Sequence, residues 1–548
     1  MGLGRIIGLA TAVAVSCLCS ATPLAAAPAV QASDPAAMQR LMPGDAVAVV
    51  GAPSLAALDQ AIAALAQAAQ SRIKGASGRL SQLRGWPKTI QLDHSRPLLV
   101  AVRPMQGLSW PDPVFILPVT EIPAVNSYAP GSALYIDGDY IGVSQDASYA
   151  PGGSASPLAD SLPEGHVAAR AHLAELLGPL RSAATAMMAV VAASQPSGLE
   201  GMGGMDSAAL ISAYTGLVFD AIEATPLVEA GLTFADGHFT LDGLCSVREG
   251  SALADIPPAS CDKLDEMVSW LDAGAPMQIV TAMDAGAYAK VLSDWMLDTS
   301  GIWPQASEDD LMEYLATMQV LGARCGFVSV GEMDFSEYGM EFAYQFEAED
   351  PNGMVELMSQ VMVMGYQLGG GQGTQATSTT EDGWTISETS VDMNASLDRL
   401  GLPDTRANAA TQEMVRKVYG GDGVMRFSTR ASADRVTMVM GGQEPAGVAA
   451  SRPPASGQAP EQIAFALQRV DGAHTRMAMH LNYTSLMVSM FSLMSESPEL
   501  NLPPLDRLKG AEPVSLIVWA GGKGTQWNFG LDFDVAAMAR LMQLVTER

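Results

Sequence analysis

A short apolar run, a polar residue and then an amphipathic stretch recur in this order along the chain. Residues 46–50 have the pattern of a strand, and Ser54 is placed to cap a helix over 55–70, since its hydroxyl can accept a hydrogen bond from the first helical turn. The same order predicts further strand–helix units whose strands are 166–172, 277–283 and 476–481. Strands and helices are therefore expected to alternate over much of the chain.

Pairs of apolar runs separated by tight-turn residues predict β-hairpins. Asp137-Gly138 and Asp236-Gly237 each lie between two alternating runs. Asp-Gly favours a two-residue turn because both turn positions need positive φ. Longer hairpins are predicted across Glu337 to Gly339 and across Gly521 to Gly524.

These units predict an α+β fold with mostly antiparallel sheets covered by helices, built as two related halves. The expected division is a leader over 1–32, an N-terminal α+β half over 33–272 and a C-terminal α+β half over 273–548. The strand–helix units that begin near 277 and 476 align by eye, which favours an internal repeat. Small and polar residues predict flexible loops near 366–383 and 441–460.

The first 32 residues have the layout of a secretory signal peptide. Arg5 gives the positive start, an apolar run over 6–16 follows, and small residues lead to a cleavage site after Ala32. The run is shorter than the roughly 20 residues that span a bilayer. Retention as an N-terminal anchor and lipidation at Cys17 or Cys19 are the alternatives. We therefore expect an exported protein of the periplasm or the exterior, without a transmembrane span in the mature chain.

The charge balance excludes two classes of partner. The chain has 30 basic and 59 acidic residues and a formal net charge of −29. Nucleic acids and anionic lipid surfaces are recognised by clustered Lys and Arg, so neither is expected to bind. A hydrophobic content of 48% is enough for a sizeable core.

Three cysteines lie beyond the leader. Cys245 and Cys261 are close in sequence and are the candidates for a disulfide in an oxidising compartment, which would leave Cys325 as a thiol. Their spacing fits no zinc motif, so no metal site is predicted.

The polar motifs favour structural roles over catalysis. Ser71 to Lys74 matches Ser-x-x-Lys but has no partner motif, and the Gly521 to Thr525 stretch has the wrong spacing for a phosphate loop. His480 is expected to be a hydrogen-bonded histidine at a strand end. The densest carboxylate clusters, 308–310 and 347–350, resemble helix starts and loops. We predict no catalytic residue and no cofactor.

Methionine is the unusual component, with 32 residues. Met354, Met358 and Met362 share one helix face, and Met487 and Met490 lie together on another helix. Pliable core filling is the simpler interpretation, while an adaptable apolar groove would make these five residues candidates for ligand binding.

The stretch Leu41-Met42-Pro43-Gly44-Asp45, followed by an apolar strand and then Ser54-Leu55 at a helix start, resembles the beginning of a family of uncharacterised bacterial exported proteins. The family pattern is a signal peptide, a Leu-x-Pro-x-Asp entry to the first strand, and repeated strand–helix and hairpin units. The resemblance implies export and this architecture, and it brings no catalytic residues.

Together these patterns favour an exported, non-enzymatic envelope protein that binds an unknown envelope partner or an apolar ligand. The alternatives are a secreted hydrolase that uses carboxylates and a structural protein of the envelope. The hydrolase would need two facing acids in a cleft.

Overall fold

The computed structural model describes residues 35–68, 75–77, 90–105, 109, 112–121, 132–153, 158, 162, 164–194, 215–216, 219–251, 254–298, 306–336, 339–368, 374–392, 424–441, 458–470, 472–494 and 505–546. The expected leader with its cleavage site, the Ser71 to Lys74 motif and most of the loop expected at 441–460 lie outside these residues.

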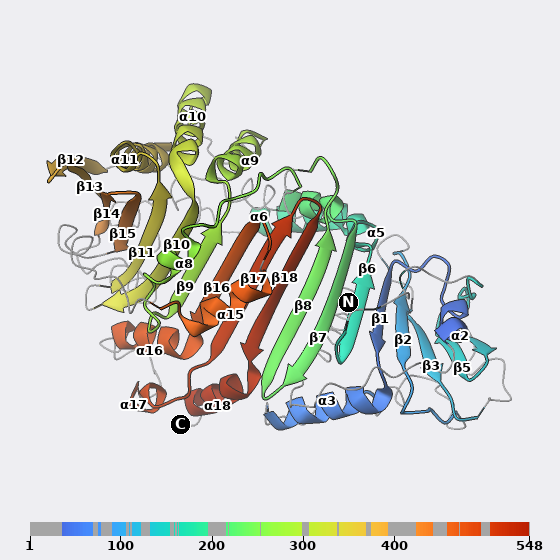
Figure 1. Cartoon of the computed structure of the whole chain (residues 1–548). Coiled ribbons are helices and arrows are strands. Elements are labelled where there is room, and N and C mark those ends of the chain that lie inside the picture. The colour runs from blue at the N-terminus through green and yellow to red at the C-terminus, as the bar shows by residue number, and fades with distance from the viewer. Residues whose placement is uncertain are drawn as a thin grey trace. The chain divides into compact units, whose positions relative to one another are not determined.

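Antiparallel β-structure dominates the described residues (Figure 1), with eighteen strands and 38% strand against 36% helix. The expected fold, α+β sheets covered by helices in two related halves, is therefore wrong. Local sequence patterns predicted individual strands and helices, but they did not indicate how many strands would pair with one another.

The chain forms two compact units. Unit 1 comprises 1–183, 219–248 and 525–547, and unit 2 comprises 184–218, 249–524 and 548. Each unit is built from antiparallel neighbours whose register is regular over most of their length.

Among its described residues, unit 1 contains nine strands. α3 (Leu55–Ala68) and α18 (Val535–Thr546) are its longer helices, and α2 (Pro35–Arg40) and α5 (Leu173–Leu177) are short. The strands are ordered β4 (Ala133–Asp137), β5 (Tyr140–Ser144), β3 (Val114–Pro118), β2 (Leu98–Val102), β1 (Ala48–Ala52), β6 (Val167–Ala171), β7 (Leu227–Ala235), β8 (His238–Ser246) and β18 (Gln526–Asp534).

Local sequence signals account for several of these elements. The Ser54 hydroxyl accepts a hydrogen bond from Ala57 N at 3.0 Å, which confirms the predicted cap of α3. The β7–β8 hairpin turns through Asp236 and Gly237, with φ of 54° and 86°. An Asp-Gly pair adopts this conformation at little cost, so the predicted hairpin is confirmed.

The part of unit 2 that the structure describes also contains nine strands. Its longer helices are α9 (Ala285–Asp298), α10 (Glu308–Arg324), α11 (Pro351–Leu368), α15 (Glu461–Arg469) and α16 (Tyr483–Met494). Two short helices, α8 (Leu264–Val268) and α17 (Leu505–Lys509), complete the described set in this unit, while α6 (Arg181–Ser194) begins in unit 1. The strands are ordered β12 (Gln375–Glu381), β13 (Trp384–Asp392), β14 (Val424–Ser432), β15 (Arg435–Gly441), β11 (Gly339–Ala348), β10 (Cys325–Ser336), β9 (Met277–Ala282), β16 (Thr475–Asn482) and β17 (Ser515–Lys523).

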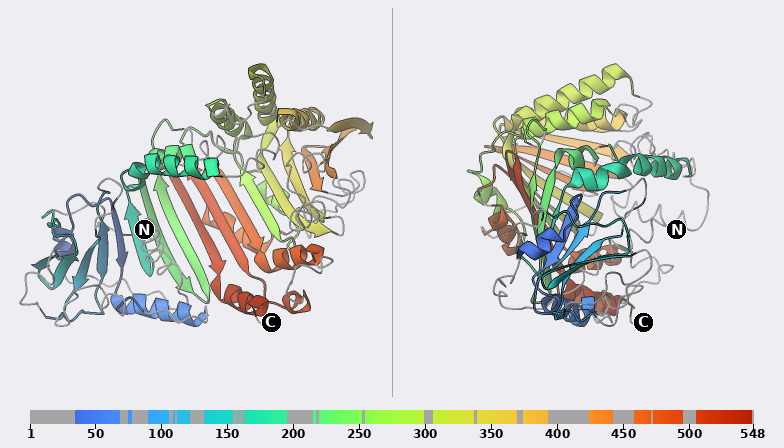
Figure 2. Two further views of the ribbon diagram at one scale, coloured as in Figure 1. Left: turned by 180° about the vertical axis from the view of Figure 1, so that it is seen from behind. Right: turned by 90° about the vertical axis from the view of Figure 1, so that its right-hand side faces the viewer.

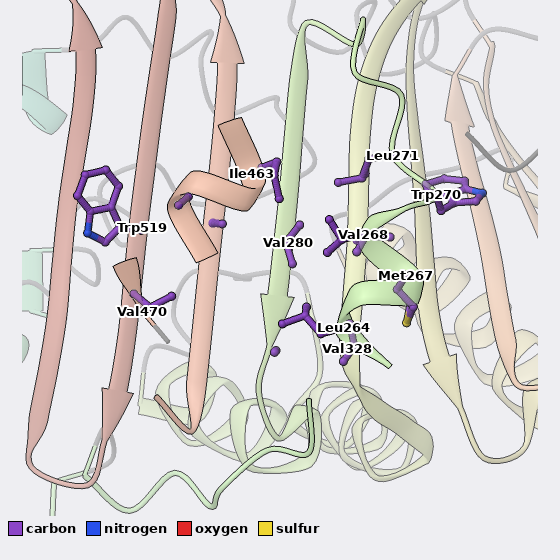
Figure 3. Close-up of a cluster of buried hydrophobic side chains, with 14 of the residues drawn as sticks. Leu264, Met267, Val268, Trp270, Leu271, Val280, Val328, Ile463, Val470 and Trp519 are labelled. Carbon is purple, nitrogen blue, oxygen red and sulfur yellow. The ribbon is translucent and has the colours of Figure 1, made fainter. Parts of the chain in front are cut away.

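The main core of unit 2 lies on one side of its sheet (Figure 3). Val280 and Trp519 project from their strands toward α8 and α15. Val330 and Ala478 belong to the same cluster, and all four residues are at most 1% exposed. Phe465 on α15 contacts the Trp519 ring edge-to-face at a centroid distance of 5.8 Å. This side of the sheet is therefore a dry, close-packed interior.

Candidate functional site

The other side of the unit 2 sheet is apolar as well. The register places three residues from each of five strands on this side, and none of them is charged. We call this surface the open sheet face. Its residues are Phe342, Tyr344 and Phe346 on β11, Ser329, Gly331 and Met333 on β10, Met277, Ile279 and Thr281 on β9, Met477, Met479 and Leu481 on β16, and Leu516, Val518 and Ala520 on β17.

Most of these side chains are partly accessible to solvent. Ile279, Met479 and Val518 are half-buried, and Met477 is 36% exposed. Their neighbours on the opposite side of the same strands are fully buried, so the difference comes from the helices that cover one side. Viewed from behind, β9, β16 and β17 present this surface without α8 or α15 in front (Figure 2).

An aromatic ladder runs along the β11 side of the open sheet face. The Phe342 and Tyr344 rings stack at a centroid distance of 6.5 Å, and the Tyr344 and Phe346 rings stack at 6.0 Å. Tyr344 leans over Gly331 on β10, where an added Cβ would lie 2.4 Å from the Tyr344 ring. The ring thus occupies the space that a side chain at position 331 would fill.

The open sheet face ends beneath α11. Phe346 packs at the margin of a cluster in which Met354, Met358 and Val355 of α11 meet Val436 of β15. Because Val436 pairs directly with Phe346, α11 lies on the same side of the sheet as the open sheet face. The helix therefore covers the end strands of unit 2 and leaves the middle strands to form the open area.

The predicted methionine candidates fall into three environments. Met354 and Met358 are core residues of the α11 cluster, 1% and 7% exposed, while Met362 is half-buried farther along α11. Met487 is half-buried and Met490 is 41% exposed on α16. Met354 and Met358 thus fill the core beside the open sheet face.

Two hydroxyl groups interrupt the apolar surface. Thr281 and Ser329 are cross-strand partners, and their hydroxyl oxygens lie 2.5 Å apart in a hydrogen bond. Both residues are half-buried, and their nearest partners across the sheet include Met477 and Phe346. Together with the Tyr344 hydroxyl, this pair supplies the polar side-chain groups of the open sheet face.

The covered side contains a buried polar row. His480, Gln278 and Glu332 lie opposite one another on β16, β9 and β10, and each is at most 4% exposed. His480 Nδ1 lies 3.2 Å from Gln278 Oε1, and Gln278 Nε2 donates to the carbonyl oxygen of Asp272 at 2.5 Å. Burial lowers the pKa of His480 to about 4. This imidazole is therefore a neutral, structural group.

Unit 1 carries a different polar cluster at the start of β8. His238 Nδ1 lies 2.7 Å from Asp532 Oδ1, and the Thr240 hydroxyl donates to Asp532 Oδ2 at 2.6 Å. Asp534, beside them, accepts a hydrogen bond from Ala537 N and caps α18. The hydrogen bond with Asp532 raises the pKa of His238. The arrangement fixes a helix start and places the His238 imidazole beside the carboxylates of Asp532 and Asp534.

The remaining predicted groups have local partners. Cys245, Cys261 and Cys325 are thiols, so the predicted Cys245–Cys261 bridge is not formed in this structure, and burial raises the pKa of Cys325 to about 11. The 308–310 acids form the first turn of α10 behind its Ser307 cap, and Glu347 accepts the backbone N–H of Phe327 and Val328. Within the described residues, His, Cys, Asp and Glu form no group of three or more suited to a metal ion.

Sequence reasoning did not identify the open sheet face. Met477 to Met479 and Ile279 to Val280 carry apolar residues on both alternating sets of positions, which indicates strands that are partly apolar on both sides. That signal was present, but it does not tell which strands become neighbours. β10 and β11 form a local hairpin, but their strands join β9 and β16 only through pairings between segments far apart in the sequence.

None of the described helices combines the length and the apolar character that crossing a bilayer requires. The predicted lack of a transmembrane helix is in agreement with this finding as far as the described residues extend.

Comparison with known proteins identifies no family. No family model matches the chain, and no curated protein matches it. Crystal form III of TP0453 is similar with 11% identity and a TM-score of 0.24, over 53% of this chain and 98% of that chain. Crystal form IV of TP0453 has 11% identity and a TM-score of 0.23, over 54% of this chain and 99% of that chain. Likeness at this level carries no argument about fold or function.

Proposed function

We propose that this chain is an exported, non-enzymatic envelope protein that binds an elongated apolar ligand, such as a lipid acyl chain, on the open sheet face. The observation that carries the proposal is that the unit 2 sheet is apolar on its accessible side as well as on its helix-covered side. Its helix-covered side holds Glu332, Gln278 and His480, whereas its accessible side carries no charge. Antiparallel sheets with one solvated side normally place polar residues there.

The dimensions and residue types of the open sheet face suit an acyl chain. Five neighbouring strands span about 19 Å, since adjacent strands lie about 4.8 Å apart, and this matches an extended long-chain acyl group. Methionine side chains such as Met477 and Met479 are flexible and polarisable, so they can adapt to an irregular apolar surface. Each methylene that the ligand removes from water contributes about 0.8 kcal/mol.

The proposed absence of catalysis rests on the chemistry of the face itself. Its polar groups are the hydroxyls of Thr281, Ser329 and Tyr344, and it carries neither a carboxylate nor an imidazole. Export rests on the leader pattern over 1–32 and on the −29 net charge, which favours solubility outside the cytoplasm. The resemblance to uncharacterised exported proteins points the same way.

Binding of methyl oleate, an uncharged acyl chain with a minimal head, tests the proposal. Radiolabelled methyl oleate should co-elute with the full chain in gel filtration. Met479→Asp and Met477→Asp should reduce the bound amount by at least about tenfold, because a carboxylate beside a buried acyl chain stays unpaired. Met312→Asp is the matched control, since Met312 is a 50% exposed methionine on α10 outside the face and should bind normally.

Circular dichroism and thermal melting must first show that the Asp variants fold. Failure of the wild-type chain to retain methyl oleate contradicts the proposal, as does equal loss in the Met312→Asp control. A dimer in ligand-free solution that dissociates in the Met477→Asp variant would instead assign the open sheet face to a second copy of the chain.

A further inference from the structure

The hydroxyl pair of Thr281 and Ser329 on the open sheet face indicates which head group the ligand carries. Thr281 and Ser329 lie side by side within one cross-strand row, between Phe346 on β11 and Met477 on β16. Two hydroxyls carry two protons, and the bond between them uses one. One hydroxyl proton and several lone pairs remain for a further hydrogen bond on the accessible side.

We infer that the ligand is an uncharged lipid whose hydroxyl or ester head binds at Thr281 and Ser329, with its acyl chain along the rows of Ile279 and Met479. The inference rests on the proposed function and adds the class of head group. An ester carbonyl accepts from a hydroxyl, and a glycerol hydroxyl can both donate and accept, so either head satisfies the pair.

Charge complementarity argues against an anionic lipid. None of the positions on the open sheet face is a Lys, Arg or His. A carboxylate or phosphate head placed there would lose water without gaining a cation, which is costly even at a half-buried site. The −29 net charge adds a weaker, longer-range repulsion.

The hydroxyl pair also has a structural neighbourhood that suits a head group. Phe346 beside Ser329 belongs to the margin of the α11 cluster, so the pair lies where the open area meets a covered region. A head at this boundary can be partly enclosed, while the chain extends over the accessible strands. If the ligand's head bound elsewhere, methylene groups would cover the hydroxyls of Thr281 and Ser329. The remaining hydroxyl proton would then have no partner on the ligand, which is unfavourable.

Three ligands with one acyl chain test the head class. Monooleoylglycerol has hydroxyls and an ester, methyl oleate has an ester alone, and oleate is anionic at pH 7.5. Displacement of radiolabelled methyl oleate from the full chain should show monooleoylglycerol binding roughly tenfold or more tighter than oleate. Thr281→Val with Ser329→Ala should bring monooleoylglycerol down to the affinity of methyl oleate.

Thr317→Val is the matched control, because Thr317 is half-buried like the hydroxyl pair, lies on α10 outside the open sheet face, and donates to the carbonyl oxygen of Glu313. It should leave all three affinities unchanged. Oleate binding as tightly as monooleoylglycerol would overturn the uncharged-head inference and leave the proposed function standing. An unchanged monooleoylglycerol affinity in the double variant would overturn the role of the hydroxyl pair. Loss of binding by all three ligands in the wild-type chain would instead contradict the proposed function.

Discussion

Tyr344 lies across Gly331, its cross-strand partner, so closely that an added Cβ would meet Cδ1 of the Tyr344 ring at 2.4 Å. Because Gly331 has no side chain, the Tyr344 ring can pack directly against the backbone of β10 and cover it. This relationship holds the middle of the aromatic ladder in place.

Gly331→Ala should therefore displace the Tyr344 ring. We expect a loss of about 1–3 kcal/mol in the free energy of unfolding, because a methyl group in occupied space forces its neighbour out of position. Urea denaturation followed by tyrosine and tryptophan fluorescence measures it. Gly178→Ala is the control: nothing lies within 4 Å of its added Cβ and its φ is −51°, so that variant should be neutral or slightly stabilising. Equal effects at both positions would refute the packing argument.

The two sides of the unit 2 sheet should differ in their tolerance to truncation. Trp519 on the covered side is 1% exposed and packs against α15, whereas Val518 beside it is half-buried on the open sheet face. Trp519→Ala should cost about 3–5 kcal/mol, and Val518→Ala at most about 1 kcal/mol. Urea denaturation of the two variants makes the comparison. A cost for Val518→Ala close to that of Trp519→Ala would show that the face is covered in solution.

Sequence reasoning succeeded where the signal was local. The Ser54 cap and the Asp236-Gly237 turn are both as predicted, because a cap or a turn depends on a few adjacent residues. The helix predicted after residue 172 is instead divided into α5, a short 3-10 turn and α6. Gly178 and Pro179 at the division account for the break.

The layering of the sheet and the candidate site depend on contacts that the local pattern does not contain. Ile279 and Met479 pair across about two hundred residues of chain, and Tyr344 joins their row through Gly331. Apolar residues on both sides of a strand are typical of a sheet buried on both sides, so the pattern favoured helices on each. Unit 2 covers one side with α8 and α15 and leaves much of the other accessible.

The thiol state of the cysteines can be read directly by peptide mapping. Cys245 and Cys261 are thiols in the structure, so alkylation of the unfolded, unreduced protein should label both. In the native protein Cys325 should react more slowly than an ordinary thiol, since its pKa of about 11 leaves little thiolate at neutral pH. Recovery of a Cys245–Cys261 disulfide peptide from exported protein would instead establish the bridge predicted from sequence spacing.

His480 should make β16 less stable as the pH falls. Its folded pKa is about 4 against a reference of 6.5, so below pH 6.5 the unfolded state takes up a proton that the folded state does not. Stability present above pH 6.5 is therefore lost on acidification, and levels off below about pH 4. Between pH 7 and pH 5 the loss is about 2 kcal/mol. Hydrogen exchange of β16 amides measures it, and His480→Gln should remove the dependence while retaining a group that can bond Gln278.

His238 should show the opposite dependence. Its hydrogen bond with Asp532 raises the folded pKa above 6.5, so its contribution is fully present below pH 6.5 and is lost as the pH rises through the folded pKa. The side chain is 39% exposed, and solvent screening limits the contribution to about 1 kcal/mol or less. His238→Gln should therefore lower the protection of β8 amides more at pH 6 than at pH 9.

Asp532→Asn should remove the same pH-dependent component, and combining it with His238→Gln should add nothing further to that component. This non-additivity separates a coupled pair from two independent effects, because Asp532 also accepts from Thr240 and its loss has a pH-independent cost as well. A pH dependence of β8 protection that survives in the double variant would assign the effect to another titrating group. Between pH 5 and pH 8 the stabilising contribution of His480 increases with pH, whereas that of His238 decreases. The sign of the pH dependence should therefore distinguish the two histidines.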